Sequence, residues 1–244
     1  MPRPPAHHSR PAVTEQQAGL HDRAGEPRRG LTRLLAGVAL SVLVLLLGIL
    51  AKMAPVAGFD LRIDRHIAAY DRTSTLTALA RAVTTLATPE TVGLGLMILI
   101  PVILLLIRRR LDALKAFCMI AGAFALAEIG KKLINEHRPP VSLWAMKADS
   151  GASYPSGHVT TAAVIVVALI VIAATRTGRT VALVLGGLYA LAVAASRVYL
   201  ADHYLLDVVG GILCALAAAF IVTGIAALPA LQPRLRRLEA RRSR

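Results

Sequence analysis

Apolar residues in this 244-residue chain come in long blocks rather than at the short helical or alternating intervals of soluble domains. Six blocks carry almost no charged side chain; they cover residues 34–51, 91–107, 113–130, 159–174, 181–195 and 208–228. About 20 helical residues cross the roughly 30 Å hydrocarbon core of a bilayer. The pattern therefore predicts an all-α, polytopic membrane protein with six transmembrane helices. Two blocks, 159–174 and 181–195, are short, so their polar flanks must lie near the membrane interface.

The segments outside the blocks have a different composition. Residues 1–33 are rich in proline, arginine, glycine and histidine, which predicts a disordered basic cytoplasmic tail. Residues 34–228 would form the membrane domain, and residues 229–244 a second basic cytoplasmic tail. Between the first two blocks, apolar residues recur at loosely helical intervals, as in an amphipathic segment on a membrane surface. Arginines alternate there with Asp60, Asp64 and Asp71, and this alternation predicts local ion pairs.

The net charge of +14 is distributed unevenly along the chain. With the N-terminus inside, 18 of the 28 lysines and arginines lie in cytoplasmic segments, which is the positive-inside pattern. We therefore expect both termini in the cytoplasm. The abundance of alanine, valine, leucine and arginine suggests a bacterial source, hence a bacterial cytoplasmic membrane. No basic patch is interleaved with aromatic residues, so the expected partners are membrane lipids, with no nucleic acid and no obligate protein partner.

Polar residues interrupt the apolar half of the chain in three clusters, at 131–140 (KKLINEHRPP), 155–158 (PSGH) and 196–207 (SRVYLADHYLLD). Counted from an inside N-terminus, the third and fifth blocks end on the outer side, and the fourth and sixth begin there. All three clusters therefore share the outer face, where positive charge is least expected. Helix ends on one face can meet in one pocket. We accordingly predict an active site formed by helix ends at the outer membrane face.

Five residues of these clusters suit an anion. Lys131 and Arg138 are two helical turns apart, and the proline after Arg138 places it at or just beyond a helix end. Ser156 and Gly157 precede a helix whose first N–H groups are free, an arrangement that suits phosphate. Arg197 adds a forked donor that matches phosphate oxygens. Single cations near span ends usually extend to the headgroups, but that tendency does not explain their grouping beside two histidines.

Two histidines and an aspartate suggest catalysis at this anion site. His203 and Asp207 are four residues apart at the start of a helix, hence on one face. A carboxylate there can accept the imidazole N–H and fix its tautomer, as in a serine protease triad. The other nitrogen of His203 can then act as the nucleophile. His158, from another helix, is left to carry the proton.

The three clusters together resemble a known family. The motifs K-x6-R-P at 131–139, P-S-G-H at 155–158 and S-R-x5-H-x3-D at 196–207 form the signature of the type-2 phosphatidic acid phosphatase superfamily. Its membrane members are lipid phosphate phosphatases. The resemblance implies that His203 forms a phosphohistidine, that Asp207 orients it and that His158 is the acid and base. It also implies that the five anion-binding residues hold the phosphoryl oxygens and that no metal or other cofactor is required.

The implied activity is hydrolysis of a lipid phosphate or prenyl diphosphate outside the cytoplasm. Undecaprenyl diphosphate, phosphatidylglycerol phosphate and phosphatidate are all candidate substrates. Three other functions share the polar clusters: a membrane transporter, a non-catalytic lipid-binding protein, and a haloperoxidase with vanadate in the oxyanion site. Three further polar residues near the motifs are interpreted as loop residues or leaving-group contacts rather than catalysts; these are Glu136, His137 and Asp149.

Overall fold

A computed structural model describes residues 12–149 and 151–235 of the chain, with side chains from residue 28 onward. All regular elements in this part of the chain are helical, so the all-α prediction is confirmed. Five helices are long and apolar enough to cross a bilayer: Arg28–Ala51, Ser74–Leu106, Arg110–Ile134, Arg176–Tyr199 and Leu205–Ala226. The remaining predicted span corresponds to Gly157–Ile172, which is apolar but has only 16 residues. The count of six crossings therefore stays a prediction.

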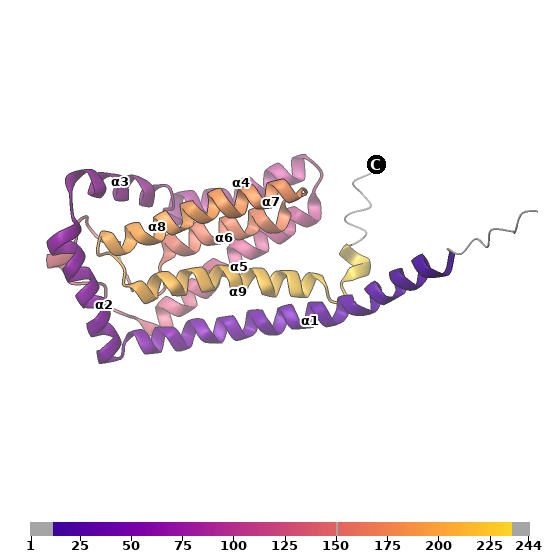
Figure 1. Ribbon diagram of the computed structural model, residues 1–244, viewed down its shortest axis with the longest axis horizontal. Helices are drawn as coiled ribbons and strands as arrows, with labels where there is room; N and C mark the ends of the chain where they lie inside the picture. Colours follow the sequence, from indigo (N-terminus) through magenta and orange to yellow (C-terminus); the bar gives the residue numbers. More distant parts are fainter. Residues whose placement is uncertain (1–11, 150, 236–244) are drawn as a thin grey trace, which may run out of the picture.

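Most of the elements follow one another along the chain with short connections, and the α5–α6 connection is long. The α-helices are α1 (Ala12–Ala51), α2 (Ala54–His66), α3 (Ser74–Thr85), α4 (Leu94–Leu106), α5 (Arg110–Ile134), α6 (Gly157–Ile172), α7 (Arg176–Val181), α8 (Gly187–Tyr199) and α9 (Leu205–Ala226). Single π-helical turns continue α2 at Ile67–Asp71, lead into α4 at Pro89–Gly93 and join α7 to α8 at Ala182–Gly186. A 3₁₀ turn, Val141–Leu143, lies in the long α5–α6 connection. Figure 1 shows the long helices running side by side.

The first helix begins well before the first apolar block. Composition predicts a disordered tail over residues 1–33. Residues 12–33 form the N-terminal part of α1, and residues 1–11 lie outside the described residues. Extending an existing helix costs less than nucleating one, because each added residue gains a hydrogen bond. From Gly30 onward α1 packs along α9 (Figure 1), and a Cβ on Gly37 would lie 2.6 Å from Ile221. Small residues allow this close approach of two helix backbones.

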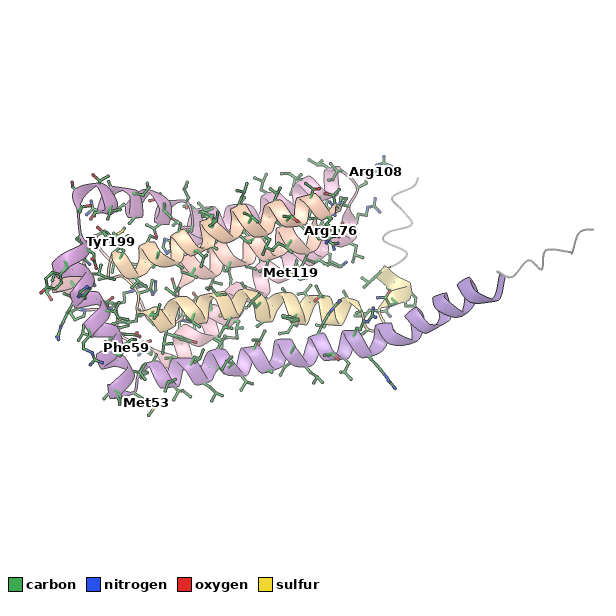
Figure 2. The ribbon with its side chains drawn as sticks, in the orientation of Figure 1. Met53, Phe59, Arg108, Met119, Arg176 and Tyr199 are labelled. Carbon is green, nitrogen blue, oxygen red and sulfur yellow. The ribbon has the colours of Figure 1, made fainter. Side chains whose placement is uncertain are left out.

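The centre of the bundle is formed by α5, α6 and α9. Their buried contacts are made largely by alanine and other aliphatic side chains, including Met119, Ile120, Val164 and Ala215. Large apolar side chains on α1, α4 and α8 point outward instead (Figure 2), with Leu106 77% exposed. An apolar exterior around a small-residue interior is the arrangement expected in hydrocarbon, where close packing rather than water exclusion holds helices together.

Helix α2 lies across one end of the bundle, at the left of Figure 1. Its Asp60 and Asp64, one helical turn apart, are both buried, at 4% and 1% exposure. Local ion pairing was expected for these aspartates; among the described residues neither makes a salt bridge, and neither carboxylate oxygen of Asp64 has a hydrogen-bond partner. Burial first, and then the nearby carboxylate of Asp60, raises the pKa of Asp64 to about 7. The prediction fails because α2 turns these side chains toward the bundle.

The substitution Asp64→Asn is expected to stabilise the protein above neutral pH. A raised pKa in the folded state means that the carboxyl's stabilising contribution is present below its unfolded pKa of about 4 and is lost as pH rises through about 7. We expect the unfolding midpoint of the variant to rise by about 3 °C or more at pH 8.5, and to change little at pH 5. Thermal unfolding in detergent at both pH values measures this. The exposed Asp71→Asn is the control, and equal effects of the two variants would contradict the interpretation.

Candidate active site

Four helix ends meet at the end of the bundle that α2 covers. They are the C-terminal ends of α5 and α8 and the N-terminal ends of α6 and α9. Tyr199, the last residue of α8, lies at this end of the molecule, and Arg108 and Arg176 lie at the other (Figure 2). Backbone hydrogen bonds fix the connecting loops: the Ser156 N–H donates to the Asp207 carbonyl at 3.0 Å. A Cβ on Gly211 would lie 2.8 Å from the Ser156 carbonyl oxygen, so glycine lets α6 begin against α9.

His203 is held by Asp207 from the first turn of α9. The His203 Nδ1 lies 3.2 Å from Asp207 Oδ2, and both residues are completely or almost completely buried. The same oxygen accepts the Tyr204 N–H at 2.9 Å and the hydroxyl of Ser153. Burial, assisted by two nearby arginines, lowers the pKa of His203 to about 3. The ring is therefore neutral at physiological pH, and its Nε2 is available as a lone-pair donor.

The Nε2 side of His203 faces a guanidinium and a carboxylate. Arg138 Nη1 lies 3.3 Å from Nε2, and Asp202 Oδ2 lies 3.3 Å from it. Arg138 is positioned by the backbone, since it donates to the carbonyls of Asp202 at 3.0 Å and Gly151 at 3.2 Å. Its guanidinium also pairs with the Asp202 carboxylate at 2.8 Å. A positive group thus lies directly beside Nε2, the ring nitrogen that Asp207 does not contact.

Arg197 connects His203 to His158 through carboxylates. Its Nη2 donates to Asp149 Oδ2 at 2.8 Å and also contacts Asp202, and its Nη1 donates to Thr84 Oγ1 at 2.7 Å. Asp149 Oδ2 lies 3.2 Å from His158 Nδ1. Although burial raises the pKa of Asp149, hydrogen bonds from His158 and Arg197 outweigh it and lower the pKa well below the usual range. Asp149 is therefore ionised and orients the His158 ring.

The start of α6 supplies donors that are not fully used. Ser156 is completely buried, and among the described residues its hydroxyl has no hydrogen-bond partner. Lys131 Nζ lies 3.5 Å from the position that a Cβ on Gly157 would take, so this cation adjoins the N-terminus of α6. Lys131 is also paired with Glu128 at 3.2 Å, and no contact joins it to Arg138 within the part of the chain that the structure describes. Of the eight predicted site residues, Lys131 therefore lies at the edge of the group.

The sequence interpretation overlooked three residues of this site. Ser153, Asp202 and Thr84 contact Asp207, Arg138 and Arg197 respectively. Asp202 directly precedes His203, and Ser153 lies two residues before the P-S-G-H motif, so proximity in sequence was the available signal. Thr84 comes from α3, more than 100 residues away from Arg197, and offered no such signal.

One group in the site has the residue types of a metal centre. Asp149, Asp202 and His203 offer ligand atoms that all lie within 4.8 Å of one another. Both carboxylates, however, are already paired with Arg197, and Asp202 is also paired with Arg138. Two fixed guanidinium groups repel a cation from this position. These residues therefore favour an anion over a metal ion. The anion would bind beside the carboxylates or take their place.

Glu136 lies close to Asp207, in the connection that follows α5. It is 7% exposed, and its backbone carbonyl accepts the Ser153 N–H at 2.9 Å. Asp207 Oδ1 and Glu136 Oε2 have no hydrogen-bond partner among the described residues, so a proton on Glu136 would allow the two buried carboxyl groups to share a hydrogen bond. Burial first, and then the negative charge of Asp207, raises the pKa of Glu136 to about 9. The other charged groups near Glu136 are Asp60 and Lys52.

We expect the alkaline limit of activity to depend on Glu136. Above about pH 9 its carboxyl ionises, repels Asp207 and loses the hydrogen bond that it donates. The substitution Glu136→Gln keeps a donor, so catalysis at pH 7 should persist while the alkaline decline in kcat disappears. Glu136→Leu removes the donor and should lower kcat roughly tenfold at every pH, as expected for a lost bond to a charged group. Rates between pH 6 and 10 measure both effects. An unchanged alkaline limit in Glu136→Gln would assign that limit to another group.

Comparison with known proteins gives a matching family and three matching chains among solved structures, two of which are informative here. The family model described as PAP2 superfamily matches residues 112–228. The crystal structure of the first transmembrane PAP2-type phosphatidylglycerolphosphate phosphatase from Bacillus subtilis is 25% identical, with a TM-score of 0.68 over 78% of this chain and 94% of that one. The structure of LpxE from Aquifex aeolicus is 20% identical, with a TM-score of 0.51 over 72% of this chain and 96% of that one, and shares the fold. The search of curated proteins gives no match.

Proposed function

Because the chain belongs to the PAP2 superfamily and is a membrane lipid phosphatase, we propose that it hydrolyses a lipid phosphate or prenyl diphosphate through a phosphohistidine on His203. The reaction would take place at the outer face of the cytoplasmic membrane. Candidate substrates are phosphatidylglycerol phosphate, which the Bacillus subtilis enzyme is named for, undecaprenyl diphosphate and phosphatidate. Neither a metal ion nor another cofactor takes part in the proposed reaction.

The arrangement around His203 supports this proposal most directly. Asp207 and Ser153 occupy the Nδ1 side of the ring, and Arg138 lies 3.3 Å from Nε2. A neutral imidazole whose free nitrogen faces a guanidinium suits attack on an anionic phosphorus centre. The guanidinium attracts the phosphoryl oxygens, and the Asp207 carboxylate stabilises the positive charge that the ring acquires.

In the first step, the Nε2 lone pair of His203 forms a bond to phosphorus, and the bond from phosphorus to the leaving oxygen breaks. His158 gives a proton to that oxygen, so the lipid alcohol, or the lipid monophosphate from a diphosphate, departs with its leaving oxygen protonated. Because Asp149 contacts Nδ1 of His158, Nε2 is the nitrogen left for this proton transfer. In the second step, His158 takes a proton from water, whose oxygen attacks phosphorus as the N–P bond breaks. Inorganic phosphate leaves and both rings return to their starting states.

The transferred phosphoryl group would lie among Arg138, Arg197 and the first turn of α6. The free N–H groups at a helix N-terminus and two forked guanidinium groups are well suited to its equatorial oxygens. The unpartnered hydroxyl of buried Ser156 supplies a further donor, and Lys131 approaches across Gly157. These donors would stabilise the transition state most strongly, because it carries the most charge on those oxygens.

A groove beside α6 supports a substrate with a lipid tail. Its volume is about 200 Å³, and it is lined by Pro89, Leu94, Phe124 and Ala127 together with Glu90, Glu128, Lys131 and Gly157. The apolar residues belong to the membrane-facing helices, and the polar residues lie beside the start of α6. An amphiphile can therefore place its headgroup at Lys131 and Gly157 while its chain stays among apolar side chains.

The test is phosphate release from the three candidate substrates by purified protein in detergent containing EDTA. We expect release from at least one substrate, and the ranking identifies the preferred headgroup. His203→Ala is the control for contaminating phosphatases. Loss of activity with EDTA, or equal release by both proteins, would contradict the metal-independent histidine mechanism.

A further inference from the structure

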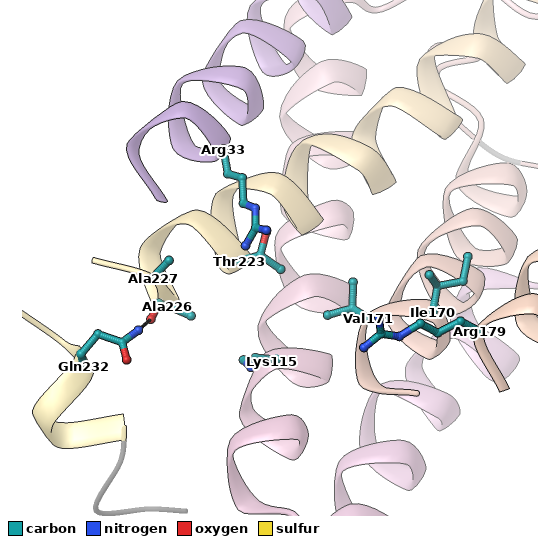
Figure 3. Close-up of a pocket in the computed structure, with 9 residues that line it drawn as sticks. All are labelled: Arg33, Lys115, Ile170, Val171, Arg179, Thr223, Ala226, Ala227 and Gln232. Atoms are coloured by element: carbon teal, nitrogen blue, oxygen red, sulfur yellow. Dashed lines mark hydrogen bonds between the residues drawn. The ribbon is translucent and has the colours of Figure 1, made fainter. Parts of the chain in front are cut away.

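A second polar cavity lies at the opposite end of the bundle from His203. It has a volume of about 520 Å³, which is within the usual range of small-molecule sites. Arg33 of α1, Lys115 of α5 and Arg179 of α7 line it, together with Thr223 near the end of α9 and Gln232 beyond it (Figure 3). Thr223 is 16 residues after Asp207 on α9, so about 24 Å of helix separates this cavity from the catalytic residues.

The three cations of the cavity have no acidic partner among the described residues. The nearest acid along α5 is Asp112, one turn before Lys115, and its carboxylate is engaged by Arg109 at 2.8 Å. Arg179 makes one contact, from its Nε to the Ala173 carbonyl at 3.3 Å. Three positive side chains that converge from three elements repel one another. A bound anion would remove this repulsion.

The two neutral polar residues of the cavity each donate one hydrogen bond within the protein. The Thr223 hydroxyl donates to the Ala219 carbonyl at 2.7 Å, and Gln232 Nε2 donates to the Ala226 carbonyl at 2.7 Å. The donors left for a ligand are therefore those of Arg33, Lys115 and Arg179, with the second N–H of Gln232. Such a set selects a compact anion with several oxygens, of which a phosphate group is the common biological example.

The rest of the lining is apolar and comes from the ends of the apolar helices α6 and α9. Ile170 and Val171 come from the last turn of α6, and Ala226 and Ala227 from the end of α9. A polar pocket beside apolar helix ends is where lipid headgroups lie. Other cations at this end, including Arg110 and Arg176, do not line the cavity.

We propose that this cavity binds the phosphate headgroup of an anionic phospholipid from the leaflet opposite the active-site end. The occupant is a bound lipid and not a substrate, because neither a histidine nor a carboxylate lines the cavity. Its headgroup would join α1, α5, α7 and the chain after α9, and so stabilise the folded protein by mass action.

The test is thermal unfolding of the full-length protein in a neutral detergent, titrated with short-chain phosphatidylglycerol or phosphatidylcholine. The variant is the pair Lys115→Gln and Arg179→Gln. The matched control is the pair Arg110→Gln and Arg176→Gln, which removes the same charge from the same two helices at the same end. We expect phosphatidylglycerol to raise the unfolding midpoint of the wild type and the control pair, and its apparent affinity to fall about tenfold or more in the cavity pair.

Three outcomes would overturn the proposal. Equal loss of affinity in both pairs would indicate general surface charge, and equal stabilisation by phosphatidylcholine would exclude selection of an anionic headgroup. Millimolar inorganic phosphate is tested alone, because the free anion could bind the same three cations as a lipid headgroup. If it reproduces the whole effect of phosphatidylglycerol in a cavity-dependent way, the ligand is the free anion and not a lipid. Phosphate release from substrate should stay within about twofold in both pairs, since 24 Å separates the two sites.

Discussion

His203→Ala is expected to lower the rate of phosphate release about 1,000-fold or more and to abolish the covalent intermediate. The residue supplies the attacking nitrogen, and the loss of a nucleophile is usually the most damaging single change in an enzyme that uses one. Asp207, Ser153 and Arg138 would remain around the empty position, but none of them can replace the imidazole. Rapid mixing with phosphorus-labelled substrate, followed by an alkaline quench that preserves phosphohistidine, measures both rate and intermediate.

His158→Ala is the informative companion to that variant. If His158 activates water in the second step, the variant should be slow overall and yet accumulate labelled protein, whereas His203→Ala should show no label. Phosphotransfer to His203 in the first step would be fastest with a leaving group that needs no proton, such as p-nitrophenolate. Label retained in His203→Ala would reject this residue as the nucleophile, even if its activity were low.

Arg197→Lys should lower kcat/KM by about 100- to 1,000-fold, the range seen when one oxyanion donor is removed. Arg197 is 1% exposed, and its two terminal nitrogens contact three different side chains, Thr84, Asp149 and Asp202. A lysine ammonium cannot maintain these contacts and present a forked pair to a phosphoryl group. Competitive inhibition by orthovanadate should weaken in parallel, because vanadate would occupy the same anion site.

The control for this variant is Arg176→Lys, in the same long helical segment but at the opposite end of the bundle. It should change kcat/KM by less than about twofold, as surface substitutions far from a site usually do. Circular dichroism and the unfolding midpoint are needed as well, since unpaired Asp149 and Asp202 would destabilise the fold. Unchanged vanadate inhibition in a folded Arg197→Lys protein would contradict the assignment of Arg197 to the anion site.

The apolar blocks predicted the membrane helices well because each is defined by a local property, continuous hydrophobicity. Their ends were harder to predict. Helix α6 starts at Gly157 and ends at Ile172. Each end therefore lies two residues before the corresponding end of the predicted block, 159–174. The aspartates of α2 were misjudged for a different reason: the alternating arginines are visible in sequence, but the turn of α2 toward the bundle depends on tertiary packing.

The site likewise contains features that the sequence predicts and features that depend on tertiary structure. The order of the three motifs along the chain, with the count of crossings, anticipates which helix ends meet. The contacts of Asp149 depend on a loop that returns between Arg197 and His158, and loop conformation is not encoded in spacing. In sequence Glu136 is indistinguishable from an ordinary loop acid, because its proximity to Asp207 depends on the fold. Motif spacing indicates the eight predicted residues, and the contacts that only the fold brings together, such as those of Thr84 and Asp202, supply the rest.

Because the two ends of α9 lie at opposite ends of the bundle, the proposed active site serves one leaflet of the bilayer. The proposed catalytic residues lie at the start of that helix, and the packing of Gly30 against Ala227 lies at the other end. In the proposed mechanism, only headgroups in the leaflet at the His203 end reach the site. A lipid phosphate made in the opposite leaflet would first have to be moved across the bilayer, so for such a substrate the proposed reaction depends on transbilayer transfer. Hydrolysis on one side then releases phosphate into a single compartment and keeps the concentration of the charged lipid unequal between the two leaflets.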